Sequence, residues 1–277
     1  MLRTIGRFGM TLLIASSFNI ASSLSNPQEA VAGVLTLPDG GSCEGEISNG
    51  VLNGKVTCKY ANGDSYEGNF TNGKKQGQGV YTFAKGGRYE GEFSEDKPNG
   101  KGVRAYPDGD RYEGEFKDGQ PNGTGVYIRA DGGRYEGQFT AGNPSGKGTF
   151  TYAKGDHCSG DITDGQLNGK GVCEYANKNR YEGELKNGQP NGQGVGQFSG
   201  TGVYTFANGD SEALLRSADR CEGQFSAGQL NGKGACKYAN GDSFDGEFRN
   251  VEKDKGAYIF ADGARVEGTW KDGKLQN

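Results

Sequence analysis

Six cysteines are the side chains in this sequence whose spacing most directly predicts chemistry. They fall into three pairs whose two members are 15 positions apart: Cys43 and Cys58, Cys158 and Cys173, Cys221 and Cys236. Zinc sites favour closely spaced cysteines and four converging ligands, and free thiols have no reason to recur at one fixed interval. We therefore expect three disulfides, each within its own pair, and an oxidising compartment.

Other groups that could do chemistry have simpler explanations. Paired glutamates are the groups that glycoside hydrolases use, but here the same pair returns along the chain, so we interpret it as a solvated ladder partnered across strands by arginines such as Arg88 and Arg111. His157 precedes Cys158, which the spacing assigns to a disulfide. Asp108 and Asp110 lack the nonapeptide pattern of calcium-binding β-rolls. We expect no catalytic residue, no metal and no cofactor.

The composition excludes several classes of protein. Of 277 residues, 52 are Gly and 32% are hydrophobic, which is too few apolar side chains for the thick core of an ordinary α/β enzyme. The glycines follow no three-residue period and only 7 residues are Pro, so collagen is excluded. A single His argues against multi-histidine sites, and a net charge of -4 argues against a general nucleic-acid binder.

Internal repetition is the dominant pattern in the chain. The block Tyr66-Glu67-Gly68-Asn69-Phe70 returns along the sequence, and the first six steps between its central glycines are all 23 residues. The next step is 40 residues and the last is 22. We interpret this as ten clear copies and one degenerate copy, with an insertion, in residues 194–220. Ala213, Leu214 and Leu215 of the insertion could form one short helical turn.

Each repeat reads as two short strands. The first strand contains the Tyr-Glu-Gly block, a loop such as residues 118–123 follows, and the second strand covers a segment such as residues 77–83. A tight Asn-Gly or Asp-Gly turn, such as residues 61–64, leads to the next repeat. The predicted fold class is all-β: an elongated single-layer antiparallel sheet of successive β-hairpin repeats, about eleven units long.

The odd repeat length requires a register device. Strand side chains alternate with period two, so a 23-residue step keeps one set of side chains on one face only if each repeat has an odd-length turn or a bulge. We place it at the Asn62-Gly63-Asp64 type of turn, as a three-residue hairpin with a bulge at the glycine. If Cys43 faces Cys58, then Gly45 faces Val56 and Ile47 faces Gly54.

The block YEGEF, followed by NGxGVYxFANGDRYEGEF, resembles the MORN (membrane occupation and recognition nexus) repeat. The resemblance covers about residues 34–273. It implies a binding or scaffolding module, in some family members for phospholipids or for dimerisation. Family members that are enzymes carry a lipid kinase or methyltransferase domain beside the repeats, and the insertion at residues 211–220 is too short to be such a domain.

The first 32 residues have the pattern of a cleaved signal peptide. Arg3 and Arg7 precede a short apolar core at residues 10–20, and Ala30-Val31-Ala32 is the small-x-small motif of a cleavage site after Ala32. A retained membrane anchor is the alternative, but the apolar run is short and polar for a span. The predicted mature chain, residues 33–277, loses Arg3, Arg7 and Glu29, and its net charge becomes -5. We expect a secreted or periplasmic protein.

The aromatic and glycine face of the sheet is the predicted binding face, although its side chains could equally pack on one another as a one-dimensional core. Its candidate residues are Tyr66, Phe70, Tyr81, Tyr89, Phe93, Tyr112, Phe116, Tyr127, Tyr135, Phe139 and Tyr181. We expect a non-enzymatic scaffold that mediates protein–protein interaction or self-association. The alternatives are a peripheral membrane module that binds phospholipid and a binder of envelope glycans.

Overall fold

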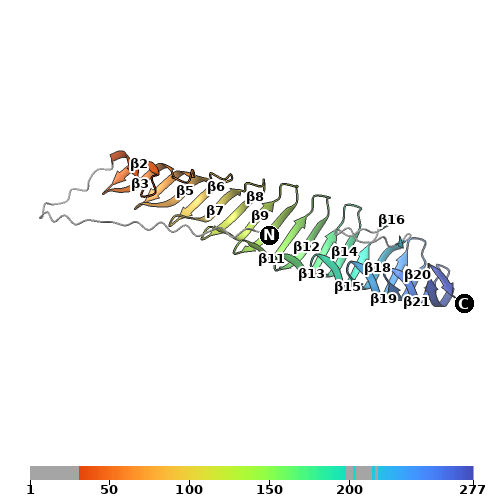
Figure 1. Ribbon diagram of the computed structural model, residues 1–277. Helices are drawn as coiled ribbons and strands as arrows, with labels where there is room; N and C mark the ends of the chain where they lie inside the picture. Colours follow the sequence, from red (N-terminus) through yellow and green to blue (C-terminus); the bar gives the residue numbers. More distant parts are fainter. Residues whose placement is uncertain (1–30, 198–201, 204–213, 216–217, 277) are drawn as a thin grey trace. The chain divides into compact units, whose positions relative to one another are not determined.

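The computed structural model describes residues 31–197, 202–203, 214–215 and 218–276, and every element in these ranges is a β-strand (Figure 1). The chain divides into two compact units: Met1–Ala130 with Phe139–Asn143, and Asp131–Gln138 with Pro144–Asn277. Among the described residues, no helix has the length and apolar character needed to cross a membrane. The predicted cleavage site at Ala32 lies within the first strand, and residues 1–30 lie outside the described ranges.

In the first unit, each strand pairs antiparallel with the next along the chain. Its strands are β1 (Val31–Thr36), β2 (Ser42–Ser48), β3 (Val51–Lys59), β4 (Ser65–Thr71), β5 (Lys74–Thr82), β6 (Arg88–Ser94), β7 (Lys97–Ala105), β8 (Arg111–Lys117) and β9 (Gln120–Ile128). The unit boundary passes through the hairpin of β10 (Arg134–Thr140) and β11 (Asn143–Thr151).

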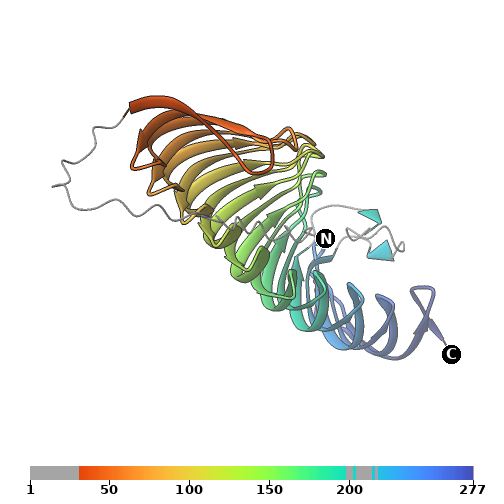
Figure 2. The same cartoon turned by 60° about the vertical axis from the view of Figure 1, so that its left-hand side comes forward.

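The second unit continues the same pattern of successive hairpins (Figure 2). Its further strands are β12 (His157–Thr163), β13 (Gln166–Glu174), β14 (Arg180–Lys186), β15 (Gln189–Gln197), β18 (Ala218–Ser226), β19 (Gln229–Tyr238), β20 (Ser243–Arg249), β21 (Glu252–Ile259), β22 (Arg265–Lys271) and β23 (Lys274–Gln276). The predicted all-β fold of antiparallel hairpins is confirmed. Within the insertion, β17 (Leu214–Leu215) pairs with β16 (Gly202–Val203), so a helical turn at these two leucines is wrong.

The turn inside each repeat is shorter than predicted. Asp118 and Gly119 both have left-handed backbone angles, with φ of 51° and 86°, which is the geometry of a two-residue type I′ turn. Gln120 already belongs to β9, so the expected loop over residues 118–123 is a strand after its first two residues. A type I′ turn matches the right-handed strand twist, which lets pairing begin at once.

The turn between repeats supplies the odd residue. The Tyr60 amide donates to the Asp64 carbonyl, and the Gly63 amide donates to the Tyr60 carbonyl, both at 2.9 Å. Gly63 has a φ of 84°, so the three-residue hairpin ends in a glycine bulge. This is the register device predicted at Asn62-Gly63-Asp64, and it places facing tyrosines of successive strands on one side of the sheet.

A second irregularity lies inside each hairpin, and the sequence reasoning missed it. Gly68 pairs with Gly79, but Phe70 pairs with Lys75, so β5 carries two extra residues opposite β4. The equivalent bulge in the first hairpin makes Ile47 face Leu52, and the expected pairing of Ile47 with Gly54 is wrong. Two extra residues leave the alternation of faces unchanged, because the side-chain period is two.

The last full hairpin explains the 22-residue step. Glu247 pairs with Lys255 and Phe248 with Lys253, so only one extra residue remains in this bulge. The residue that this repeat lacks was therefore removed from the bulge of β21, while its turn keeps two residues with positive φ, Asn250 and Val251. The bulge tolerates a change of length because its residues have no strict partner in the ladder.

Candidate functional site

The six cysteines form the three disulfides that their spacing predicts. The bonds join Cys43 to Cys58, Cys158 to Cys173, and Cys221 to Cys236, with Cα atoms 4.0, 4.0 and 4.1 Å apart. In each case the two residues face each other directly on neighbouring strands. All six are 3% exposed or less. The disulfides therefore lie in the interior of the hairpins, where they brace the fold.

Each disulfide is accompanied by a buried leucine that the sequence reasoning missed. Leu52, Leu167 and Leu230 are 0–3% exposed, and each follows the first cysteine of its pair by nine residues. In the repeats that have a tyrosine in place of that cysteine, the ninth residue is Lys75, Pro98, Pro121, Pro144 or Pro190. A Cβ built on Gly223 or Gly234 would lie 3.2 Å from Leu230 Cδ1. The leucine thus fills the space that a tyrosine ring occupies elsewhere.

In the tyrosine repeats, one ring closes the interior of each hairpin. The ring of Tyr112 lies against the facing pair Gly114 and Gly125, and a Cβ on either glycine would overlap it. Its hydroxyl donates to the Glu115 carbonyl at 2.9 Å, and Tyr66, Tyr89, Tyr135 and Tyr181 make the equivalent hydrogen bond. Glycine is needed at these positions because no side chain fits between the ring and the backbone.

Most of the predicted binding face is interior. Tyr112 packs edge-to-face on Phe116 and Phe139, with ring centroids 5.0 and 4.8 Å apart. Nine of the eleven predicted residues are 5% exposed or less: Tyr66, Phe70, Tyr89, Phe93, Tyr112, Phe116, Tyr135, Phe139 and Tyr181. Edge-to-face packing along the repeats buries these side chains against one another. They form the core of the sheet, and no ligand can reach them as an exposed surface.

The two remaining residues of that face, Tyr81 and Tyr127, are half-buried and belong to a row beside the turns between repeats. We call this row in the first unit the turn-side stripe: Tyr60, Tyr81, Phe83, Arg104, Tyr106 and Tyr127. Neighbouring rings touch, with centroids 5.9 Å apart for Tyr60 and Tyr81 and 6.0 Å for Tyr106 and Tyr127. The stripe keeps part of each ring accessible, whereas the tyrosine core does not.

Arg104 interrupts the stripe with a cation. Its guanidinium carbon lies 3.7 Å from the centre of the Phe83 ring and 5.5 Å from that of Tyr106. Among the described residues it has no ion-pair partner, and its Nε is buried without a hydrogen bond. Burial lowers the pKa of Arg104, and nearby tyrosine and aspartate groups oppose this shift. The rings of Phe83 and Tyr106 thus lie within cation–π distance of this positive charge.

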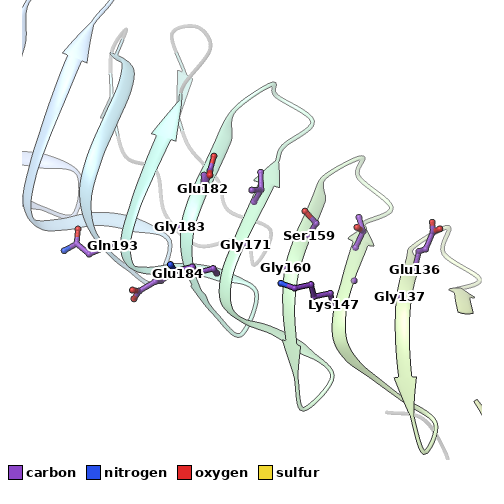
Figure 3. Close-up of a pocket in the computed structure, with 14 residues that line it drawn as sticks. Glu136, Gly137, Lys147, Ser159, Gly160, Gly171, Glu182, Gly183, Glu184 and Gln193 are labelled. Carbon is purple, nitrogen blue, oxygen red and sulfur yellow. The ribbon is translucent and has the colours of Figure 1, made fainter. Parts of the chain in front are cut away.

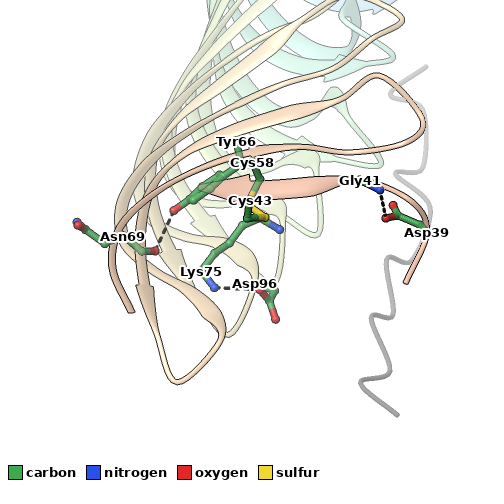
Figure 4. The surroundings of a disulfide bond; sticks show 8 residues. All are labelled: Asp39, Gly41, Cys43, Cys58, Tyr66, Asn69, Lys75 and Asp96. Carbon is green, nitrogen blue, oxygen red and sulfur yellow. Dashed lines mark hydrogen bonds between the residues drawn. A yellow bond between two sulfur atoms is a disulfide. The ribbon is translucent and has the colours of Figure 1, made fainter. Parts of the chain in front are cut away.

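Two lysines lie inside cages of aromatic rings. Lys75 Nζ lies 5.3, 5.4 and 5.5 Å from the ring centres of Tyr60, Tyr66 and Tyr81, close to the first disulfide (Figure 4). In the second unit, Lys253 lies among four rings, the nearest being Tyr258 at 4.6 Å. Burial lowers the pKa of both lysines. Both stand where other repeats have proline or leucine, so the lysine stem fills the same interior space.

Aspartate side chains connect one turn to the next through hydrogen bonds. Asp64 accepts hydrogen bonds from the Tyr81 hydroxyl at 2.6 Å and from the Ala84 amide at 2.8 Å. Burial would raise the pKa of Asp64, but these bonds and one from Asn62 outweigh it and hold the pKa below its usual range. Asp110 makes the same pair of contacts with Tyr127 and Ala130. Its carboxylate is thus engaged within the fold.

The opposite side of the sheet, which we call the glutamate face, is charged and exposed. Arginine and glutamate two residues apart on the same strand form ion pairs of 2.7–3.2 Å, as in Arg88–Glu90 and Arg111–Glu113. The predicted cross-strand partnership is therefore mostly wrong, although Arg180 also approaches Glu174 on the neighbouring strand at 4.0 Å. These pairs recur in equivalent form and are more than half exposed on the glutamate side, so no pair has the special environment that catalysis requires.

A shallow groove of about 850 Å³ crosses the glutamate face of the second unit (Figure 3). Ser159 stands where tyrosine repeats have a glutamate such as Glu113, and this small side chain opens the groove. Its rim carries both Lys147, paired with Asp161 at 2.8 Å, and Glu184. No motif of the sequence marks this groove, and its mixed charges select no ligand class.

Two further candidates from the sequence are the neighbours His157 and Cys158 and a metal site. Cys158 is in a disulfide, and a ring nitrogen of exposed His157 lies 3.1 Å from the Thr151 hydroxyl, so the two do not form a nucleophile pair. Within the described ranges, no group of three or more His, Cys, Asp or Glu side chains could hold a metal ion.

Comparison with known families gives a match over most of the chain. The MORN repeat model matches residues 43–65, 66–88, 89–111, 112–134, 135–157, 158–180, 181–195, 196–211 and 221–243. These nine segments coincide with eight of the ten clear repeats counted from the sequence and with the degenerate copy, whereas the two copies that begin at Phe244 and Val266 are not matched. No curated protein matches the sequence.

Solved structures give weaker similarities. The TCP10 domain of Danio rerio CPAP, in complex with a peptide of STIL, is 13% identical with a TM-score of 0.36, over 85% of this chain and 97% of that one. The TCP domain of Drosophila melanogaster SAS-4, in complex with a proline-rich motif of Ana2, is 12% identical with a TM-score of 0.36, over 72% and 97%. Staphylococcus aureus virginiamycin B lyase is 14% identical with a TM-score of 0.15, over 87% and 71%. These TM-scores are too low to support an argument about function.

Proposed function

Because this chain belongs to the MORN-repeat family, we propose that it is a non-enzymatic scaffold that binds a protein partner outside the cytoplasm. The observation that carries the proposal is the filled interior of the described repeats within residues 43–248. Tyrosine or phenylalanine rings, or disulfide–leucine sets, fill these hairpins from within, so they need no ligand to complete their core. Its surface side chains are thus free to bind, and the equivalent polar groups offer no single reaction centre.

The extracytoplasmic location is supported by the three disulfides. Structural disulfides persist in oxidising compartments and are rare where thiols are kept reduced. We propose that residues 1–32 are a signal peptide removed after Ala32. Cleavage there would leave β1 with residues 33–36, which still pair with Ser42 to Gly45 of β2. Mass measurement of the secreted chain should give Gly33 as the first residue, and an intact N-terminus would contradict the proposal.

Cross-linking of the protein in the cells that produce it, followed by reconstitution of the captured partner from purified components, tests the scaffold function. We expect a defined protein to bind the oxidised chain with a saturable dissociation constant. Co-sedimentation with protein-free vesicles, neutral and anionic, is the matched measurement. Binding to vesicles at physiological salt, with no protein partner, would replace the proposal with the phospholipid alternative. The negative charge of the mature chain disfavours that outcome.

A further inference from the structure

We propose that the turn-side stripe of the first unit binds a proline-rich peptide in the polyproline II conformation, lying across the strands from one repeat to the next. This inference rests on the proposed scaffold function and names the class of partner. The stripe is a part of the aromatic face that a ligand can reach, because its six side chains are half-buried whereas the tyrosines of the core are closed off.

The spacing of the repeats matches this ligand. Equivalent side chains in successive repeats are two strands apart, which is about 9.6 Å. A polyproline II helix rises about 3.1 Å per residue and repeats every three residues, which is about 9.3 Å. Every third residue of the peptide would therefore meet an equivalent group of rings. An extended β-strand peptide would not, because its side chains alternate with period two and every third one points away.

The chemistry of the stripe also fits. Proline-rich segments bind aromatic surfaces with little loss of conformational entropy, because the polyproline II form is already populated in the free peptide. Two of the rings are held in place beforehand: the hydroxyls of Tyr81 and Tyr127 donate to Asp64 and Asp110. A surface that is ordered before binding loses less entropy when the ligand arrives.

Arg104 adds charge complementarity. Its guanidinium lies between Phe83 and Tyr106 and has no carboxylate partner among the described residues. Polyproline II backbones have no internal hydrogen bonds, so their carbonyl groups are available as acceptors. We therefore expect the peptide to place a carbonyl, or the carboxylate of an acidic residue, against Arg104.

The second unit offers a control within the same chain. The positions there that correspond to Tyr81, Arg104 and Tyr127 include Cys173, Gly196 and Cys236. Two of these are in disulfides and the third has no side chain. Within the described residues, three consecutive repeats with an aromatic ring or a guanidinium at this position occur in the first unit and not in the second, where Phe150 and Tyr258 stand apart from each other.

The test uses the oxidised protein and labelled peptides of about 12 residues, which span about 37 Å in polyproline II form. The panel has proline at two of every three positions, with and without a central glutamate. A matched set has alanine in place of proline, and a cello-oligosaccharide is the glycan probe. Fluorescence anisotropy measures binding of each peptide to the wild-type protein and to three variants: Arg104→Gln, Tyr106→Leu and, in the second unit, Tyr152→Leu.

We expect the proline-rich peptides to bind and the alanine peptides to bind at least tenfold more weakly. Arg104→Gln should weaken binding of the glutamate peptide about tenfold, and Tyr106→Leu should weaken binding of every proline-rich peptide. Tyr152→Leu should leave the affinity for each peptide unchanged. The inference would be overturned if Arg104→Gln and Tyr106→Leu bound the proline-rich peptides as tightly as the wild-type protein does. It would also be overturned if only the oligosaccharide bound, or if no peptide bound. The reconstituted partner separates the two proposals: if it binds Arg104→Gln and Tyr106→Leu normally, the scaffold function holds and only the stripe assignment fails.

Discussion

Repeats built on a tyrosine and repeats built on a cysteine pair fill the same interior with different side chains. In the repeat at residues 112–134, the Tyr112 ring covers two facing glycines and its hydroxyl reaches the Glu115 carbonyl at the bulge. In the repeat at residues 158–180, a disulfide stands at the position from which the tyrosine ring extends, and Leu167 fills the space near the bulge.

This difference shows that the side chains inside a hairpin are matched to one another within a single repeat. A change at the tyrosine position is matched by changes at two other positions of the same repeat, all three of which meet across one hairpin. The first cysteine repeat shows a fourth change: Val56 lies opposite Gly45, where the tyrosine repeats have a glycine, and it is 2% exposed. A larger side chain fits there because no tyrosine ring lies over that position.

The substitution Gly125→Val should break a tyrosine repeat most severely. A Cβ at Gly125 would lie 2.5 Å from Tyr112 Cζ, so the ring must leave its place. We expect a loss of about 3 kcal/mol or more in the free energy of unfolding, at the upper end of overpacking effects. Urea unfolding of the oxidised protein measures it. The exposed neighbour Thr124→Val is the control, and an unchanged midpoint for Gly125→Val would refute the packing account.

The substitution Leu167→Ala should damage a cysteine repeat almost as much. Removing a fully buried leucine leaves a cavity that costs about 3 kcal/mol, within the usual range of 2–5 kcal/mol. The disulfide should still form, which thiol counting checks. The cysteine and leucine positions can also be built into a tyrosine repeat. The double variant Tyr112→Cys with Tyr127→Cys should be much less stable than the triple variant that also carries Pro121→Leu. Equal stability of the two would mean that the leucine is not part of the set.

The hydroxyl of the core tyrosine should contribute less than its ring. Tyr112→Phe keeps the edge-to-face contacts and removes only the hydrogen bond to the Glu115 carbonyl. We expect a loss of about 1 kcal/mol, the typical net value of one hydrogen bond. Tyr152→Phe, in which the hydroxyl lies outside this arrangement, should change the urea midpoint less. A larger effect for Tyr152→Phe than for Tyr112→Phe would contradict the assignment.

The smallest expected effect is at the junction between the first cysteine repeat and the tyrosine repeat that follows it. The pKa of Asp64 is lowered in the folded protein, so its contribution to stability is present above the unfolded pKa of about 3.9 and is lost as pH falls through the lower folded value. Asp64→Asn should therefore lower the free energy of unfolding by about 0.5 kcal/mol at neutral pH, the lower end for one hydrogen bond, and by less as pH falls through the lowered pKa of Asp64. A pH-independent difference would show that the charge of Asp64 plays no part.

Much of the fold was predictable from the chain because its signals are local and repeated. The 23-residue step, the Asn-Gly and Asp-Gly turns and the equal cysteine spacing each depend on neighbouring residues. The bulge inside the hairpin was not predictable in the same way. Gly77 has a φ of 71° there, but a glycine in a strand pattern does not say how many residues remain unpaired. Without the number of unpaired residues, the pairing of Ile47 with Leu52 could not be predicted.

The sequence by itself determined the repeat, the antiparallel hairpins, the odd-length turn and the partner of each cysteine, because these follow from spacing along one hairpin. Only the tertiary structure decided which aromatic side chains are core and which are surface. Tyr66 and Tyr81 face each other on adjacent strands, yet the first is 1% exposed and the second is half-buried. Burial depends on the packing of each ring against the glycines and phenylalanines of its own and the next repeat, and the residue type alone does not contain that information.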